Sequence, residues 1–202
     1  MKLDLKQHLK EMISAAGPSG YEDPIREIIR NAWQPLADEI RVNNLGSLVA
    51  IQRGEGSEPR PSVMIAAHMD AIGLMVTGID EGFLRFMQVG GVDPRILPGQ
   101  MVTVHGTNAE VARDLPGMVV MPPAGLLPKD GKSGPLPQKY LLVDTGLLPD
   151  EVKKLVRVGD VISFATEPME LSSECISGHT LDNRASVAAV TVALEMLSKR
   201  KH

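Results

Sequence analysis

The sequence predicts an α/β fold that is interrupted by a second, β-rich domain. Two observations favour it. Helical patterns are followed by strand patterns at the start of the chain, and from about residue 72 the pattern changes to short strands separated by glycine and proline. A helical pattern returns after residue 166. We therefore expect three segments, residues 1–71, 72–166 and 167–202.

The first segment begins with two helical patterns, LDLKQHLKEMISAA and EDPIREIIRNAWQPLA, separated by the helix-breaking stretch GPSGYED. Asp23 precedes a proline, so we expect it to be the N-cap of the second helix. Polar and apolar residues then alternate in DEIRVNN and GSLVAIQR around a turn at residues 44–46, which predicts a hairpin. The apolar run PSVMIAA, residues 61–67, predicts a buried strand that ends just before His68.

The middle segment has the short strand patterns IGLMVTGI, GFLRFMQVGG, QMVTVHG, MVVMPP and VGDVISFAT. Strands of this length and spacing are typical of a small β-sandwich or barrel. YLLVDTG predicts a further strand and LPDEVKKLV a short helix. Residues 123–137 are rich in glycine and proline, and we expect them to form an exposed, mobile loop.

The last segment predicts one helix from its apolar spacing, at Val187, Val190, Thr191, Leu194 and Leu197. Alanines fill many of the other positions, so we expect this helix to be mostly buried. Asp182 and Asn183 stand at its N-terminus, where the simplest interpretation is an N-cap. For Cys175, the simplest interpretation is a small buried apolar side chain.

Composition excludes several classes of function. The net charge is −4 and the basic residues are dispersed, so we expect no nucleic-acid partner. No apolar stretch approaches the roughly 18 residues of a membrane-spanning helix, and we expect no membrane contact. The start of the chain lacks the apolar region of a signal peptide, which favours a cytoplasmic protein.

Three polar residues indicate a metal site only when they are considered together. Alone, His68 is most simply a hydrogen-bonded histidine at a strand end, and Asp70 a turn residue. As a pair, the histidine can bind a metal through one ring nitrogen while the aspartate orients the ring. Asp182 could supply an oxygen ligand shared by two metal ions, the arrangement that activates water in amide hydrolysis.

Four stretches resemble a known family in order and spacing: AAHMDAIGLMV, VGGVDPRILPGQMVTVHG, LLVDTGLLPDEVKKLVRVGDVISF and GHTLDNRASVAAV. They are similar to the N-terminal portion of the tetrahedral metallo-aminopeptidases, the glutamyl or deblocking aminopeptidases, some of which carry a cellulase-like label. The resemblance implies half of an α/β catalytic domain, interrupted by an inserted all-β, barrel-like dimerisation domain. It also implies a peptide substrate and a homo-oligomer that assembles through the β-rich domain.

The resemblance assigns roles to individual residues. His68 matches a metal ligand, and Asp70 matches the catalytic aspartate that holds this ligand in place. Asp182 matches the carboxylate that bridges two divalent metal ions, zinc or cobalt. Asn183 and Arg184 complete the matching stretch in supporting roles.

In that family, the catalytic glutamate and the remaining ligands lie downstream of the DNR stretch. Only Glu195 and His202 follow it here as possible substitutes, and neither matches a family motif; His179 is a further candidate. We therefore expect this chain to be inactive alone, and the absence of a bound metal in the isolated chain stays open as an alternative. Two alternatives stay open: one half of a split enzyme that hydrolyses N-terminal residues, and a non-catalytic assembly or protein-binding module.

Overall fold

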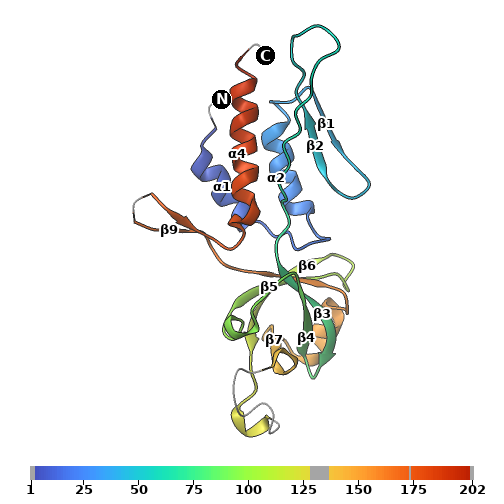
Figure 1. The fold of residues 1–202 in the computed structure, drawn as a ribbon. Helices are drawn as coiled ribbons and strands as arrows, with labels where there is room; N and C mark the ends of the chain where they lie inside the picture. Colours follow the sequence, from blue (N-terminus) through green and yellow to red (C-terminus); the bar gives the residue numbers. More distant parts are fainter. Residues whose placement is uncertain (1–2, 128–136, 173, 201–202) are drawn as a thin grey trace. The chain divides into compact units, whose positions relative to one another are not determined.

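The computed structural model describes residues 3–127, 137–172 and 174–200. Its contacts divide the chain into two compact units (Figure 1): Met1–Asp70 with Glu167–His202, called the α/β unit below, and Ala71–Thr166, called the barrel unit. Most of the loop predicted at 123–137 falls outside the described residues. In the described parts, no helix combines the length and apolar character needed to cross a membrane.

Three helices form the core of the α/β unit: α1 (Leu5–Ser14), α2 (Asp23–Trp33) and α4 (Leu181–Leu197). Each turns one apolar stripe toward the other two, as the spacing predicts. The fully or nearly buried side chains of this core are Met12, Ile25, Ile29, Val187 and Ala188. The three helices were therefore predicted correctly from periodicity.

Two short antiparallel hairpins complete this unit. The first joins β1 (Glu39–Val42) to β2 (Leu48–Ile51), and the second joins β9 (Met169–Glu170) to β10 (Ile176–Ser177). In the first turn, the Asn43 carboxamide oxygen accepts hydrogen bonds from the backbone N–H groups of Leu45 and Ser47. Gly46 has a φ of 86°, which a glycine adopts without steric cost. The predicted hairpin is confirmed.

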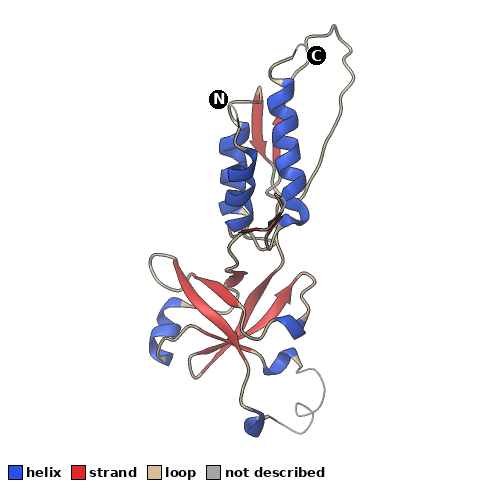
Figure 2. Ribbon diagram, turned by 90° about the vertical axis from the view of Figure 1, so that its left-hand side faces the viewer, coloured by secondary structure: helices blue, strands red, loops and turns tan. Residues whose placement is uncertain are grey.

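The prediction of a strand at residues 61–67 is wrong. The structure has no β-ladder at these positions, and Val63 and Met64 are 88% and 90% exposed. A strand needs a partner for its backbone hydrogen bonds, and no described strand pairs with this run. Apolar character alone therefore predicted an element whose pairing this chain does not provide; Figure 2 shows the segment as a long loop.

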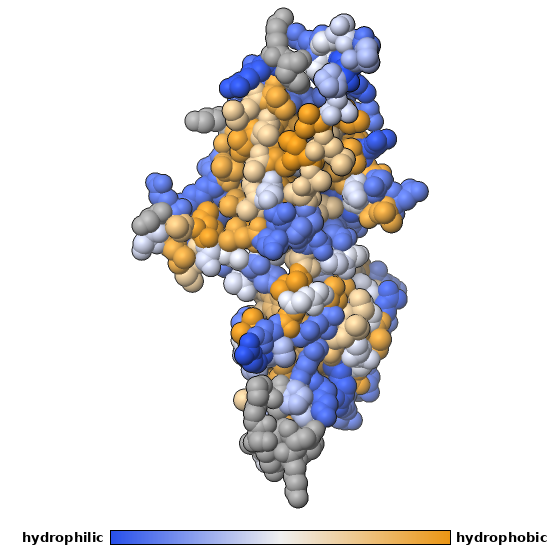
Figure 3. Space-filling model, in the orientation of Figure 1, coloured by the Kyte–Doolittle hydropathy of each residue, from blue (hydrophilic) through white to orange (hydrophobic). Residues whose placement is uncertain are grey.

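Two expectations about helices also need correction. Asp23 is the first helical residue of α2 and Glu22 holds the N-cap position; the Asp23 carboxylate pairs with Arg26 one turn later. Helix α4 buries one face only: Met196 and Leu197, near its end, are 49% and 37% exposed. Apolar atoms accordingly gather on the visible face of the helices in Figure 3.

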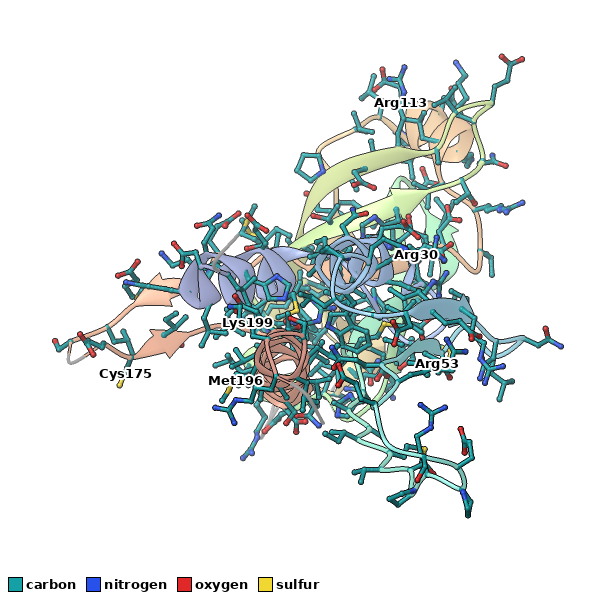
Figure 4. All side chains as sticks on the ribbon, turned by 90° about the horizontal axis from the view of Figure 1, so that it is seen from above. Arg30, Arg53, Arg113, Cys175, Met196 and Lys199 are labelled. Atoms are coloured by element: carbon teal, nitrogen blue, oxygen red, sulfur yellow. The ribbon has the colours of Figure 1, made fainter. Side chains whose placement is uncertain are left out.

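Cys175 is exposed, which corrects the expectation of a buried side chain. It lies on the β9–β10 hairpin, where its backbone carbonyl accepts a hydrogen bond from Leu171. Figure 4 shows its sulfur pointing outward at the far end of this hairpin. A hairpin of only two strands encloses no core of its own, so a side chain beside its turn stays exposed.

The barrel unit is a closed antiparallel barrel with the strand order β3–β4–β7–β6–β5–β8. This resolves the predicted alternatives of sandwich or barrel in favour of a barrel. Closure leaves no unpaired strand edge. The strands are β3 (Gly73–Asp80), β4 (Phe83–Val89), β5 (Met101–Gly106), β6 (Arg113–Val120), β7 (Leu142–Asp144) and β8 (Val161–Phe164).

The barrel has its own core. Alternate residues point inward and are fully buried, including Leu74, Leu84, Val104 and Ile162. Helix α3 (Pro149–Leu155) adds Val152 to the same cluster, and the predicted short helix is thus confirmed. All members of this apolar cluster lie within the barrel unit.

Candidate functional site

His68 and Asp70 lie on an extended segment that packs against the core of the α/β unit. Ala67 and Met69 pack on the apolar cluster of the helices. Because side chains alternate along an extended backbone, His68 and Asp70 share the opposite side. The Nδ1 atom of His68 lies 2.9 Å from Oδ1 of Asp70. The spacing of two residues therefore produces a histidine–carboxylate pair.

Asp182 reaches the same pair from the start of α4. Its Oδ1 atom lies 3.1 Å from Nε2 of His68, the ring nitrogen that does not face Asp70. Thr180 occupies the N-cap position, so the interpretation of Asp182 as an N-cap is wrong. The dihedral angles of Asp182 and Asn183 are non-helical, and the Asp182 side chain is 95% exposed. The carboxylate is thus directed to His68.

Ser19, in the loop between α1 and α2, is a partner that the sequence did not reveal. Its hydroxyl donates to Oδ2 of Asp70. This hydrogen bond, together with the neighbouring His68, holds the pKa of Asp70 below its ordinary value against the opposing effect of burial. Asp70 is therefore a carboxylate at neutral pH, with one oxygen on Ser19 and the other on His68.

Arg184 lies directly behind this arrangement and is completely buried. Its Nε atom donates to the carbonyl oxygen of Met69, at 3.0 Å. Burial lowers the pKa of Arg184 to about 10, and the charge of Asp70 acts in the opposite direction. The guanidinium is still charged at neutral pH. Its place in the matched DNR stretch was the only signal of a role.

An open pocket of about 540 Å³ borders the site. His68 and Asp70 line one side of it. Its other walls are largely apolar and come from α2, the first hairpin, the segment before His68 and the start of α4, with Ile29, Trp33, Leu48, Ala67 and Val187 among them. A pocket with apolar walls and a few polar groups at one side is typical of sites for small ligands.

The donor set within the described residues is small. No group of three or more histidine, cysteine, aspartate or glutamate side chains is arranged there to hold a metal ion. Glu195 contacts Lys199 and the backbone of Leu3, at the other end of α4 from Asp182. His202 lies outside the described residues. For His179, burial and then the charge of Arg184 lower the pKa.

The sequence comparison decides the family. A family model described as M42 glutamyl aminopeptidase matches residues 46–202. The chain belongs to this family. It is 36% identical over 198 residues to a putative aminopeptidase of Acetivibrio thermocellus, a match that covers 97% of this chain and 55% of the relative.

Solved structures of peptidases agree with the fold. A TET aminopeptidase from a marine sediment archaeon, Thaumarchaeota archaeon SCGC AB-539-E09, superposes with a TM-score of 0.86 at 27% identity, covering 96% of this chain and 53% of the other. The TET1 peptidase of Pyrococcus horikoshii, described as assembling into a tetrahedron or a large octahedral shell, gives 0.82 at 34% identity, covering 98% and 58%. The chain spans about half the length of the curated relatives it matches.

Proposed function

We propose that this M42 chain supplies part of a dinuclear metal site that hydrolyses N-terminal residues from peptides. His68 binds one ion, Asp182 provides the carboxylate shared by both ions, and Asp70 orients His68. The observation that carries the proposal is the position of His68 between two carboxylates, 2.9 Å from Asp70 and 3.1 Å from Asp182.

The chemistry of these three groups fits a cation. A neutral imidazole donates from one ring nitrogen only. When Nδ1 donates to Asp70, the lone pair of Nε2 faces a carboxylate oxygen of Asp182, and two acceptors oppose each other. A proton or a metal ion relieves this opposition, and imidazole nitrogen with carboxylate oxygen is a common zinc donor pair. The carboxylate on the second ring nitrogen is the partner that metal-binding histidines usually have.

The proposal requires further donors. Catalytic zinc sites use about three protein ligands, and the described residues provide His68 and Asp182 at this position. We infer that the remaining ligands and a glutamate general base complete the site in the whole enzyme. When bound, the metals would activate water and polarise the scissile carbonyl. The residues of this chain hold the ions and fix the histidine ring.

Metal binding by the purified chain tests the proposal. We expect isothermal titration with Co²⁺ to show one binding event that is at least about tenfold weaker in His68→Ala and in Asp182→Asn. Asp114→Asn is the matched control, because Asp114 is also exposed and also contacts a histidine, but lies in the barrel unit. Equal Co²⁺ affinity in all four proteins would contradict the proposed site.

We also propose that the barrel unit mediates self-association. Met101 and Met118 are directly opposite each other on β5 and β6, and both are more than 40% exposed. An exposed pair of flexible apolar side chains favours a protein contact. The assembly described for the Pyrococcus horikoshii relative supports the same interpretation.

Light scattering after gel filtration tests this second proposal. We expect the wild-type chain to exceed its monomer mass of 21.8 kDa. A Met101→Glu, Met118→Glu double variant should shift it toward the monomer, because charged residues are depleted in interface cores. A control pair on the α/β unit, Val63→Glu with Met64→Glu, separates the barrel surface from the exposed run before His68. Dissociation by the control pair alone would contradict assembly through the barrel.

A further inference from the structure

Arg184 joins two segments that are far apart in the sequence. Besides its bond to Met69, its Nη1 atom donates to the carbonyl oxygens of Met12 and Ala15, at the end of α1. Met12 lies in the last turn of α1 and Ala15 is its C-cap, and the Met12 carbonyl also accepts a hydrogen bond from the N–H of Ala15. One buried side chain on α4 therefore ties the end of α1 to the segment that carries His68 and Asp70.

The bond to Met69 matters for the neighbouring side chains. Met69 lies between His68 and Asp70, so fixing its carbonyl fixes the peptide plane that leads into Asp70. Arg184 itself follows Asp182 by two residues. A single donor–acceptor pair thus sets the distance between the backbone that carries His68 and the backbone that carries Asp182.

The exposed pair cannot fix this distance by itself. The side chains of His68 and Asp182 are 53% and 95% exposed. Contacts between exposed charged groups are weak because water screens them and both side chains lose rotational freedom. The contact from Arg184 to Met69 is partly buried and charge-assisted, and Arg184 itself is fully buried; charge-assisted hydrogen bonds are the stronger class.

We propose that Arg184 is a positioning residue that sets the separation of His68 from Asp182. This inference rests on the metal site proposed above. It names the residue that holds the backbone of His68 and the backbone of Asp182 at a fixed distance. It assigns Arg184 no contact with metal or substrate.

Gly17 provides a second observation. A Cβ atom at this position would lie 2.5 Å from Nη2 of Arg184 and 2.8 Å from Cγ2 of Ile25. Nη2 is buried without a hydrogen-bond partner in the described part of the chain. The guanidinium and the Ile25 side chain therefore occupy space that only glycine leaves open, and an alanine there would push on both without removing any polar group.

The first experiment uses variants of Arg184 and two readouts. Arg184→Lys keeps the charge but loses the planar fork, and Arg184→Gln loses both. The control is Thr191→Val, because Thr191 is equally buried on α4 but bonds to His8 and Trp33. The readouts are the ¹⁵N shifts of the His68 ring in the metal-free chain at pH 8, and the Kd for Co²⁺.

We expect the wild-type ring to show one tautomer, with Nδ1 protonated toward Asp70. Arg184→Gln should give averaged shifts and raise the Co²⁺ Kd at least about tenfold, with Arg184→Lys intermediate and Thr191→Val unchanged. Wild-type ring shifts and Kd in a folded Arg184→Gln would overturn the inference. If the wild-type chain binds no Co²⁺ while the ring shifts still depend on Arg184, the metal proposal fails and the positioning role stands.

The second experiment compares two glycines and applies even where the Arg184 variants do not fold. Gly17→Ala pushes on Arg184 and on the apolar Ile25, whereas Gly178→Ala pushes on an apolar side chain alone, Ile13, 2.6 Å from the added atom. We expect Gly17→Ala to alter the His68 ring shifts and Gly178→Ala to leave them unchanged. Equal ring shifts in the two variants, or loss of folding in both Arg184→Lys and Gly17→Ala, would assign Arg184 a purely structural role.

Discussion

Each unit of the molecule contains a histidine whose Nδ1 atom faces an aspartate, and the two pairs differ in what meets the other ring nitrogen. In the barrel unit, His105 faces Asp114 at 2.7 Å and the hydroxyl of Ser163 at 2.8 Å. In the α/β unit, the partners of His68 are Asp70 and Asp182, both carboxylates. His105 is 4% exposed, while the side chain of His68 is 53% exposed.

The difference separates a structural histidine from a candidate ligand. A hydroxyl can donate or accept, so a neutral His105 satisfies both of its partners. A carboxylate can only accept, so His68 satisfies both of its partners only with a positive charge on or beside the ring. Three strands, β5, β6 and β8, supply the His105 set, whereas the His68 set opens to solvent. Histidine–aspartate proximity alone is therefore a poor indicator of function.

The largest expected change in stability comes from removing the structural histidine, His105. We expect His105→Ala to lower the free energy of unfolding by about 2–4 kcal/mol, because it leaves a cavity in the barrel wall and removes the partner of Ser163. Urea unfolding followed by circular dichroism measures the change. A loss below about 1 kcal/mol would place His105 outside the group of stabilising residues and would remove the contrast between the two pairs.

The next effect concerns pH and the α/β unit. His8, on α1, is 6% exposed and contacts Thr191 on α4. Burial lowers the pKa of His8 from its ordinary 6.5, only partly opposed by Glu11. The folded state thus binds fewer protons than the unfolded state, so this contribution to stability is full above pH 6.5 and is lost as the pH falls through the lowered pKa.

We expect the free energy of unfolding to fall between pH 7 and pH 5, by at most about 1.4 kcal/mol per pH unit for this one proton. His8→Gln should have a flatter profile, because glutamine keeps a hydrogen-bonding group and does not titrate. His179, whose pKa burial also lowers, accounts for the slope that should remain in the variant. If the free energy of unfolding has the same slope against pH in the wild type and in His8→Gln, His8 is not buried in its neutral form.

Local patterns predicted most of the fold. Helices α1, α2 and α4, the first hairpin and the barrel strands follow from spacing, glycine turns and apolar alternation, all of which act within a few residues. The prediction of a strand at residues 61–67 was wrong because strand formation depends on a partner that periodicity does not reveal. The prediction that Cys175 is buried was wrong for a related reason, since burial depends on what covers a hairpin.

The candidate site was predictable to a similar extent. The pairing of His68 with Asp70 follows from two-residue spacing on an extended segment. Asp182 is 114 positions from His68, and only the family resemblance indicated that the two would meet. Ser19 had no sequence signal, because a serine in a glycine-rich loop is ordinary. The contacts of Arg184 with Met12, Ala15 and Met69 are likewise visible only in three dimensions.

The smallest expected effect tests the comparison most directly. In the absence of metal, His68→Ala should change the free energy of unfolding by less than about 1 kcal/mol. The imidazole is half-exposed, its removal leaves Asp70 bonded to Ser19, and Asp182 is already solvated. Taking the ring away also relieves any opposition between the Nε2 lone pair and the Asp182 carboxylate, which offsets part of the lost contact.

Urea unfolding in the presence of a chelator, beside His105→Ala as the destabilised reference, measures this small change. A loss for His68→Ala as large as that for His105→Ala would mean that both histidines hold their units together. A small loss, combined with weaker Co²⁺ binding, would mean that His68 contributes little to the metal-free fold. A residue whose removal leaves folding stability unchanged but weakens ligand binding is positioned for binding.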